Sequence, residues 1–341
     1  MSSSAVASAL VEAPARLHLG FLDPSASLGR RFASLGLVID GMSTQLSIAP
    51  AAHDVVEVPP GGGEAMRERL ARHIDVLRRE TGVWRAVRVT LHRAPPAHAG
   101  FGSGTQLALA VGRAFTACHG FELETRRVAT LLGRGERSGV GIAGFDRGGL
   151  LLDGGPGADG AAAPLLAHAA FPRGWRVLLV LDERLDGLHG TEERVAMGRL
   201  APFPRALSAD LCHQVLMRVL PAAMEGVFEP FAEGVSTVQR LIGDYFAPAQ
   251  GGSMYTSAGV ARLLEWIRPR YCAGIGQSSW GPTGFAVLPS AECAAEIVAA
   301  ARAAGVVDPA LRLVVVGGRN HGALLECFPP LGSRGSAASR C

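Results

Sequence analysis

The stretch HAGFGSGTQLALAVGRAF, from His98 to Phe115, decides the fold of this chain. It runs from a glycine-rich loop directly into an apolar helix. Glycine at every second position, at Gly100, Gly102 and Gly104, allows positive φ and leaves backbone N–H groups uncovered. The helix that follows directs its positive dipole end at the same point. Such a loop binds phosphate, although the same spacing also suits a tight turn that starts a packed helix.

Two common nucleotide-binding motifs are excluded by the residues around this loop. All 33 residues counted as Lys or Arg are Arg, so the chain has neither a Walker A lysine nor a Schiff-base lysine. The Rossmann pattern G-x-G-x-x-G does not fit either, because the spacing differs and the preceding RAPPAH is a loop instead of a strand end.

Length and composition narrow the class of protein. With 341 residues, 48% of them hydrophobic, the chain can bury two ordinary cores, which favours two domains. The formal charge is +3, and no basic run interleaved with aromatic residues indicates a nucleic-acid partner. The six cysteines are scattered without zinc-like spacing, and no segment approaches the ~18 apolar residues of a membrane span. We therefore expect a cytoplasmic protein with no membrane and no nucleic-acid partner.

Hydrophobic periodicity predicts strands and helices in the first half of the chain. Short apolar or alternating runs predict strands between residues 15 and 59, and residues 84–92 alternate like another strand. Helices are expected over residues 64–80, 105–118 and 125–133. Residues 139–155 are expected to form two short strands around a turn, and the Gly-, Ala- and Pro-rich residues 154–173 a linker.

The second half predicts a split β-α-β unit of the ferredoxin-like type. A strand over residues 175–181 precedes a long helical region over 191–267 that is interrupted by five prolines. Two strands over 273–278 and 283–288, a helix over 291–304 and a strand over 311–316 complete the unit. The expected domains are residues 1–170 and 171–330, followed by a loose tail over 331–341.

Four segments occur in the order of the GHMP kinase superfamily motifs: APARLHLG, the glycine loop, GERSGVGIAGFD and GQSSWGPTGFAV. Within this superfamily, ARLHLGFLD, LGLVID, GFGSGTQLALA and above all GQSSWGPT resemble the β-ribofuranosylaminobenzene 5′-phosphate synthase family. PAAMEGVFEPF and AQGGSMY also look like that family, so the resemblance covers roughly Ala13 to Cys327. It implies an α+β fold, with an N-terminal domain of the ribosomal protein S5 domain 2-like type and a C-terminal ferredoxin-like domain.

The resemblance also implies a reaction that is unusual for this fold. The family joins 4-aminobenzoate to phosphoribosyl pyrophosphate with loss of CO₂ and pyrophosphate, forming a carbon–carbon bond between ring and ribose at the start of methanopterin biosynthesis. Developing charge on the pyrophosphate calls for arginines, backbone amides and a divalent ion, Mg²⁺ or another divalent cation, with no organic cofactor. A small-molecule kinase that uses ATP is the alternative, because it would share the fold and the loop.

The motifs place the candidate residues. Gly100, Gly102, Ser103, Gly104 and Thr105 are expected to bind phosphate. The superfamily resemblance places Glu136 and Asp146 at the metal, and Asp146 also at the reacting centre. An ordinary surface pairing with a neighbouring arginine is the alternative for both acids.

Arg16 and His18 alternate on the first predicted strand and so point to one face. Both are candidate catalytic residues. For Arg16 an anionic ligand is favoured over a structural salt bridge, whereas His18 also fits a hydrogen-bonded core histidine. Ser278, Ser279 and Trp280 are the candidates for aromatic substrate binding, with a core tryptophan as the alternative. The oligomeric state stays open, with a homodimer as one option.

Overall fold

The computed structural model describes residues 8–157, 160–187, 190–329 and 339–340. Its larger sheet has eight strands in the order β12-β11-β1-β2-β4-β3, with β5 paired to β2 and β6 paired to β5. The strands of this sheet are β1 (Ser8–Asp23), β2 (Phe32–Pro50), β3 (Val55–Glu57), β4 (Val87–Arg93), β5 (Leu150–Asp153), β6 (Leu165–Ala169), β11 (Leu324–Phe328) and β12 (Ser339–Arg340).

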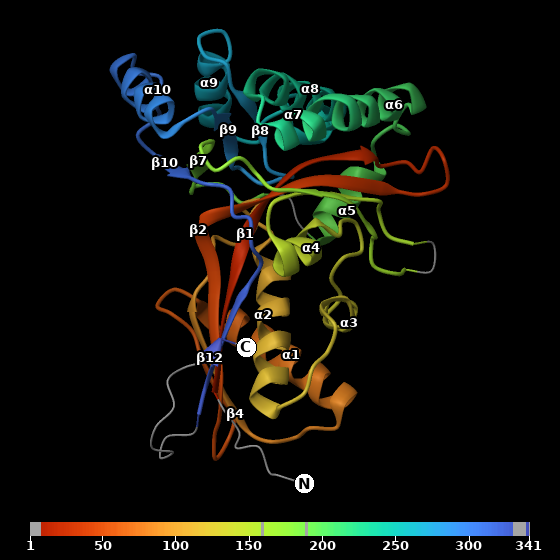
Figure 1. The fold of residues 1–341 in the computed structure, drawn as a ribbon, viewed down its shortest axis with the longest axis vertical. Coiled ribbons are helices and arrows are strands. Elements are labelled where there is room, and N and C mark those ends of the chain that lie inside the picture. Colours follow the sequence, from red (N-terminus) through yellow and green to blue (C-terminus); the bar gives the residue numbers. More distant parts are fainter. Residues whose placement is uncertain (1–7, 158–159, 188–189, 330–338, 341) are drawn as a thin grey trace.

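The antiparallel pair β1 and β2 forms the long axis of the molecule (Figure 1). The register of this pair shifts between Pro14 and Arg16 and again between His18 and Gly20. Bulges of this kind bend a strand and turn its side chains to a new direction. The segment from Arg16 to His18 thus pairs with Val38 to Gly36 between two register shifts, and the Arg16 amide donates to the Phe101 carbonyl oxygen of the glycine loop.

Four helices cover the larger sheet. They are α1 (Gly63–Thr81), α2 (Ser103–His119), α3 (Thr125–Leu131) and α4 (Val140–Arg147). Helix α2 lies along β1 and β2 and is buried on nearly all sides, with Leu107, Val111 and Phe115 in the core under the sheet (Figure 1). Burial of such side chains contributes about 1.5–3 kcal/mol each, which explains the uninterrupted apolar run after the glycine loop.

Helix α4 corrects one prediction, because two short strands were expected over residues 139–155 and only β5 forms there. The carboxylate of Asp153 explains the helix. One of its oxygens accepts from the amides of Gly139 (2.7 Å) and Val140 (3.1 Å), and the other accepts from those of Ser34 (3.1 Å) and Gly155 (2.8 Å). An acidic group at a helix N-terminus satisfies amides that lack an intrahelical partner, so a residue beyond the helix stabilises its start.

The smaller sheet has four antiparallel strands in the order β10-β7-β9-β8, which confirms the ferredoxin-like prediction. Helices α6 to α10 lie together above this sheet (Figure 1). The strands are β7 (Arg176–Asp182), β8 (Gly274–Gln277), β9 (Gly284–Leu288) and β10 (Leu311–Val316). The helices are α5 (Gly190–Gly198), α6 (Arg205–Gln214), the π-helix η1 (Val215–Val219), α7 (Leu220–Glu225), α8 (Phe228–Phe246), the 3₁₀ helix η2 (Ala247–Gln250), α9 (Ala258–Ile267) and α10 (Ala291–Ala303).

The domain boundaries differ from those expected. Strand β6 lies within the predicted linker and pairs with β5, and β11 returns to the larger sheet beside β1, although residues 171–330 were assigned to the second domain. Of the predicted tail, Ser339 and Arg340 pair with β11 and the rest lies outside the described residues. The two halves also share one hydrophobic cluster, in which Leu17 and Phe21 of β1 join Phe231 and Val235 of α8. Among the described residues, none of the helices is long and apolar enough to span a membrane.

Candidate functional site

The glycine loop forms the start of helix α2. Gly100 and Gly102 have φ of 93° and 70°, a conformation that glycine adopts at low cost, and Gly102 is the N-cap residue. Within the described chain, no side chain caps this end, and the amide of Thr105 donates to the Gly102 carbonyl oxygen at 3.0 Å, so the amides of Ser103 and Gly104 remain for a ligand. Gly104 differs from the expectation, because it lies inside the first turn and its φ is not in the left-handed region. This end of α2 offers N–H donors and a positive dipole end to an anion.

Arg16 lies directly against this loop. Its Nη1 donates to the carbonyl oxygen of Gly100 at 2.7 Å, and its backbone N–H donates to that of Phe101 at 3.1 Å. Its buried Nε has no hydrogen-bond partner in the described part of the chain, and burial lowers the pKa of Arg16 to about 10. At neutral pH the guanidinium remains positively charged and retains a donor for an anionic ligand.

Arg134 lies on the other side of the same helix end, and the sequence analysis missed it as a site residue. A β-carbon added to Gly104 would lie 3.5 Å from Nη1 of Arg134. The Arg134 Nε is buried and, over the described ranges, has no hydrogen-bond partner. Burial lowers the pKa of Arg134, the charge of Arg69 lowers it further, and Glu136 opposes the shift. The signal in the sequence was an arginine between two glycines, close after α3, that the motif order placed near the loop.

The late GQSSWGPT motif packs onto the glycine loop and β1. The hydroxyl of Ser278 donates to the Gly100 carbonyl oxygen at 2.7 Å and accepts from the backbone N–H of His18 at 3.0 Å. The amide of Ser279 donates to the His18 carbonyl oxygen at 3.3 Å. The structure therefore brings together three of the predicted groups: the glycine loop, the Arg16–His18 strand and the late serines.

A small cavity lies beside this junction, between β1, α8 and the loop after β8. Trp280 and His18 line it, together with Phe21, Phe246 and several glutamines. Trp280 packs edge-on against Phe246 at a ring separation of 4.9 Å, and His18 packs edge-on against Phe21 at 4.4 Å. Both side chains are buried; Trp280 belongs to the hydrophobic core and also lines the cavity, and its role in binding an aromatic substrate stays a prediction.

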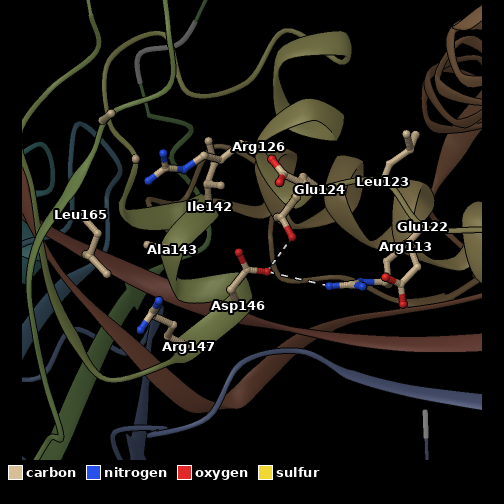
Figure 2. A pocket seen from close by; sticks show the side chains of 13 residues that line it. Arg113, Glu122, Leu123, Glu124, Arg126, Ile142, Ala143, Asp146, Arg147 and Leu165 are labelled. Atoms are coloured by element: carbon tan, nitrogen blue, oxygen red, sulfur yellow. Dashed lines mark hydrogen bonds and ion pairs between the residues drawn. The ribbon is translucent and has the colours of Figure 1, made fainter.

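Asp146 lies apart from this group, in an open pocket of about 660 Å³ (Figure 2). Its carboxylate accepts from the Thr125 hydroxyl at 2.6 Å and lies 4.0 Å from Nη2 of Arg113. Arg113 is three turns along α2 from Gly102, which is about 16 Å along the helix axis. Asp146 is exposed at the end of α4, so its side chain faces the pocket at the flank of α2 and not the glycine loop.

Glu136 lines a different pocket of about 630 Å³, with Arg31, Arg137 and Tyr245 on its walls. The structure therefore does not bring Glu136 and Asp146 together as the motif order predicted. Among the described residues, no group of three or more His, Cys, Asp or Glu side chains could hold a metal ion. Glu136 and Asp146 thus line separate pockets, and their assignment as metal ligands stays a prediction.

Comparison with known proteins identifies the relatives of this chain. Residues 68–149 match the family described as the GHMP kinases N terminal domain. A protein of Archaeoglobus fulgidus named β-ribofuranosylphenol 5′-phosphate synthase is 31% identical over 291 residues, which are 81% of this chain and 87% of the relative. A protein of Methanothermobacter thermautotrophicus with the same name is 28% identical, covering 93% of this chain and 98% of the relative.

Solved structures agree on the fold. Mevalonate diphosphate decarboxylase from Staphylococcus aureus superposes with a TM-score of 0.67 at 13% identity, covering 94% of this chain and 98% of that one. At this identity the likeness concerns the fold alone, and it confirms the GHMP kinase-like α+β architecture.

Proposed function

Because the chain belongs to the β-ribofuranosylphenol 5′-phosphate synthase family, we propose that it joins the ring of a para-substituted benzoate to phosphoribosyl pyrophosphate. The products are CO₂, pyrophosphate and a ring–ribose 5′-phosphate with a new carbon–carbon bond. The relatives are named for a phenol, whose ring carries a hydroxyl group, whereas 4-aminobenzoate would give an aminobenzene. The class of acceptor is thus a benzoate with an electron-donating para group, and 4-aminobenzoate stays a prediction within it.

The observation that carries this proposal is the convergence of two arginines on one helix end. Arg16 lies against Gly102 and Arg134 lies against Gly104, and each has a buried Nε without a partner in the described chain. Together with the first-turn amides of α2, they form a cationic cradle suited to a polyphosphate. Preorganised donors of this kind stabilise charge that develops on a leaving group.

The chemistry follows from that cradle. The ring carbon that bears the carboxylate is para to an electron-donating group, so it attacks the anomeric carbon as the bond to pyrophosphate breaks. The cationic ring then loses its carboxylate as CO₂, and the electrons of that bond restore aromaticity. Arg16, Arg134 and the α2 amides bind the pyrophosphate oxygens as their charge grows, and Gly102 leaves room for the Arg16 guanidinium at the helix end.

The proposal includes a Mg²⁺ ion that binds together with phosphoribosyl pyrophosphate. Mg²⁺ is often held by substrate phosphates, several waters and one or two carboxylates instead of a cage of protein ligands. No reaction step here depends on Glu136 or Asp146 as its ligands. The other expectations also stay predictions: a role in methanopterin biosynthesis, a cytoplasmic location, and small-molecule partners without nucleic acid or membrane.

The rival function is an ATP-dependent small-molecule kinase. The family model and the solved neighbours relate this chain to kinases at the level of the fold, and the same loop could bind the phosphates of ATP. The full-length relatives, by contrast, carry the name of a synthase, which favours the synthase.

One assay separates the two functions. The purified chain is incubated with Mg²⁺, phosphoribosyl pyrophosphate and carboxyl-labelled 4-hydroxybenzoate or 4-aminobenzoate, and in parallel with ATP. We expect labelled CO₂ and pyrophosphate in equal amounts and no ADP. Pyrophosphate without CO₂ would instead indicate a hydrolase or an N-glycosyl transferase, and ADP would indicate a kinase.

A further inference from the structure

The cavity beside the glycine loop is lined by two residues that each carry an unpartnered nitrogen in the described chain. Its volume is about 30 Å³, and its lining includes His18, Phe21, Phe246 and Trp280. His18 is 3% exposed and Trp280 is 4% exposed. His18 Nε2 and Trp280 Nε1 are buried, and neither has a hydrogen-bond partner in the described parts of the chain. Buried polar groups are nearly always paired, so two orphans on one cavity indicate that a polar group belongs there.

Two glutamines of the lining are already paired. Gln239 donates to the Leu19 carbonyl oxygen at 2.7 Å and accepts from the Gln277 amide at 2.8 Å. The side chain of Gln277 accepts from Thr256 N–H at 2.6 Å and donates to Gln250 Oε1 at 2.9 Å. Among the described lining residues, the fully buried polar side-chain atoms without a partner are thus those of the histidine and the tryptophan.

The chemistry of these two nitrogens selects the occupant. The indole Nε1–H is a donor only, so the guest must accept from it. Burial lowers the pKa of His18 to about 3, and the charge of Arg16 adds to this shift. The ring is therefore neutral at neutral pH, and its Nε2 can accept a hydrogen bond from a donor such as a hydroxyl group. None of the described lining side chains carries a charge, so a carboxylate there would have no ion-pair partner in the lining.

A hydroxyl group meets these demands, because it donates one hydrogen bond and accepts others. An amino group attached to an aromatic ring donates well, but its lone pair is delocalised into the ring and accepts poorly. A volume of about 30 Å³ holds one or two water-sized groups and is too small for a whole ring. The cavity therefore suits a polar substituent of an aromatic ring, with the ring itself outside the cavity.

The position of the cavity fits the proposed reaction. The backbone N–H of His18 donates to the Ser278 hydroxyl, and that hydroxyl donates to the carbonyl oxygen of Gly100, which lies next to the cationic cradle. In that reaction the ribose bonds to the ring carbon that carries the carboxylate, so the para substituent is the end of the ring farthest from the ribose. We propose that Trp280 and His18 bind the para-hydroxyl of a 4-hydroxybenzoate, with Trp280 Nε1 donating to the oxygen and His18 Nε2 accepting the hydroxyl proton. This inference rests on the proposed function. It assigns Trp280 and His18 as the residues that select an acceptor with a para-hydroxyl group over one with a para-amino group.

The first test needs no variant. Initial rates of pyrophosphate release are measured for 4-hydroxybenzoate and 4-aminobenzoate at saturating phosphoribosyl pyrophosphate. We expect kcat/KM to be at least about 10-fold higher for the hydroxyl acceptor, because a site built for a hydroxyl discriminates against a group that leaves its donor unpaired. Equal use of both acceptors, or a preference for the amine, overturns the inference and leaves the proposed function standing. If neither acceptor releases pyrophosphate, the proposed function itself fails.

The second test removes one donor. Trp280→Phe keeps an aromatic wall and removes Nε1–H, so we expect kcat/KM for 4-hydroxybenzoate to fall about 10-fold, that for 4-aminobenzoate to change little, and KM for phosphoribosyl pyrophosphate to stay constant. Trp175→Phe is the matched control, since Trp175 is a buried tryptophan of the same hydrophobic cluster that does not line the cavity. It should leave the ratio of the two acceptors unchanged. An equal loss on both acceptors in Trp280→Phe, as expected if the cavity holds only structural water, contradicts the assignment.

Discussion

The Arg16 guanidinium carbon lies 2.9 Å from the point that a β-carbon on Gly102 would occupy. No real β-carbon sits that close to another carbon, so residue 102 must be glycine for as long as Arg16 keeps its place. The φ of 70° at Gly102 imposes the same requirement independently. The start of α2 therefore packs against β1 through the Arg16 side chain, which occupies the space that a side chain on Gly102 would need.

Gly102→Ala should damage both the fold and the site. The left-handed backbone costs about 1 kcal/mol for alanine, and the displaced Arg16 would lose its 2.7 Å hydrogen bond to Gly100. We expect the free energy of unfolding to fall by about 1–3 kcal/mol, measured by urea denaturation. An unchanged free energy of unfolding would mean that the Arg16 side chain can adopt another conformation with equivalent hydrogen bonds.

Arg134→Gln tests the residue that only the structure revealed. Loss of charge-assisted hydrogen bonds to pyrophosphate, at about 1.5–3 kcal/mol, should raise KM for phosphoribosyl pyrophosphate about 10- to 100-fold. Arg126→Gln is the control, because Arg126 belongs to neighbouring α3 and is exposed. A similar KM in both variants would indicate that Arg134 serves the packing of α1 and α2 and not the ligand.

Asp146→Asn should have a small effect. Its exposed carboxylate is held by Thr125 and lies at the flank of α2, where surface charge pairs contribute about 0–1 kcal/mol. We expect kcat to change by less than about threefold across a Mg²⁺ titration. A loss of about 100-fold, as the motif order predicted for a catalytic acid, would restore Asp146 to the reacting centre.

The sequence and the family resemblance singled out Arg16, the glycine loop and Ser278 as candidate site residues, and the structure shows that Arg16 and Ser278 both donate to the Gly100 carbonyl oxygen. Glycine spacing predicts an open helix end, and strand alternation predicts that Arg16 and His18 share a face. The type and order of most strands and helices also followed from periodicity, since the apolar runs are long and unmixed.

The missed features depend on contacts between distant residues. Helix α4 starts where Asp153 caps it, and nothing within residues 139–147 announces that cap. Arg134 reaches the end of α2 only because α3 and α4 turn the chain back toward it. Glu136 and Asp146 were paired by motif order, but Glu136 precedes α4 and Asp146 lies near its end, and the two residues line different pockets.

His73 should make the fold sensitive to acid. Burial, with the nearby charges of Arg134 and Arg69 adding to it, lowers its pKa from 6.5 to about 4. The unfolded chain then binds more protons than the folded one between these values, so stability is complete above pH 6.5 and is lost as pH falls through that window. His73→Gln should remove up to about 1.4 kcal/mol per pH unit of this slope, whereas His53→Gln, at an exposed position, should not. Urea denaturation at pH 7 and pH 5 measures the slopes, and equal slopes in all three proteins would contradict the prediction.

Gly104→Ala separates ligand binding from folding. Gly104 lies in the first turn of α2 without positive φ, and an added methyl carbon would make an ordinary contact of 3.5 Å with Nη1 of Arg134. The fold tolerates alanine there, and alanine in a helix is favoured over glycine by about 0.5–1 kcal/mol, so the melting temperature should stay constant or rise.

The same methyl group would lie on the side of the helix end at which Arg134 is proposed to bind the anion. It would keep a phosphate oxygen from reaching the amides and the guanidinium together. Losing two charge-assisted hydrogen bonds, at about 1.5–3 kcal/mol each, would weaken phosphoribosyl pyrophosphate binding by about two orders of magnitude or more. A benzoate, which carries no phosphate, should bind as before. Calorimetric titration with each substrate, beside a thermal melt, measures all three quantities. A lower melting temperature with unchanged affinity would mean that the glycines serve only to start a packed helix.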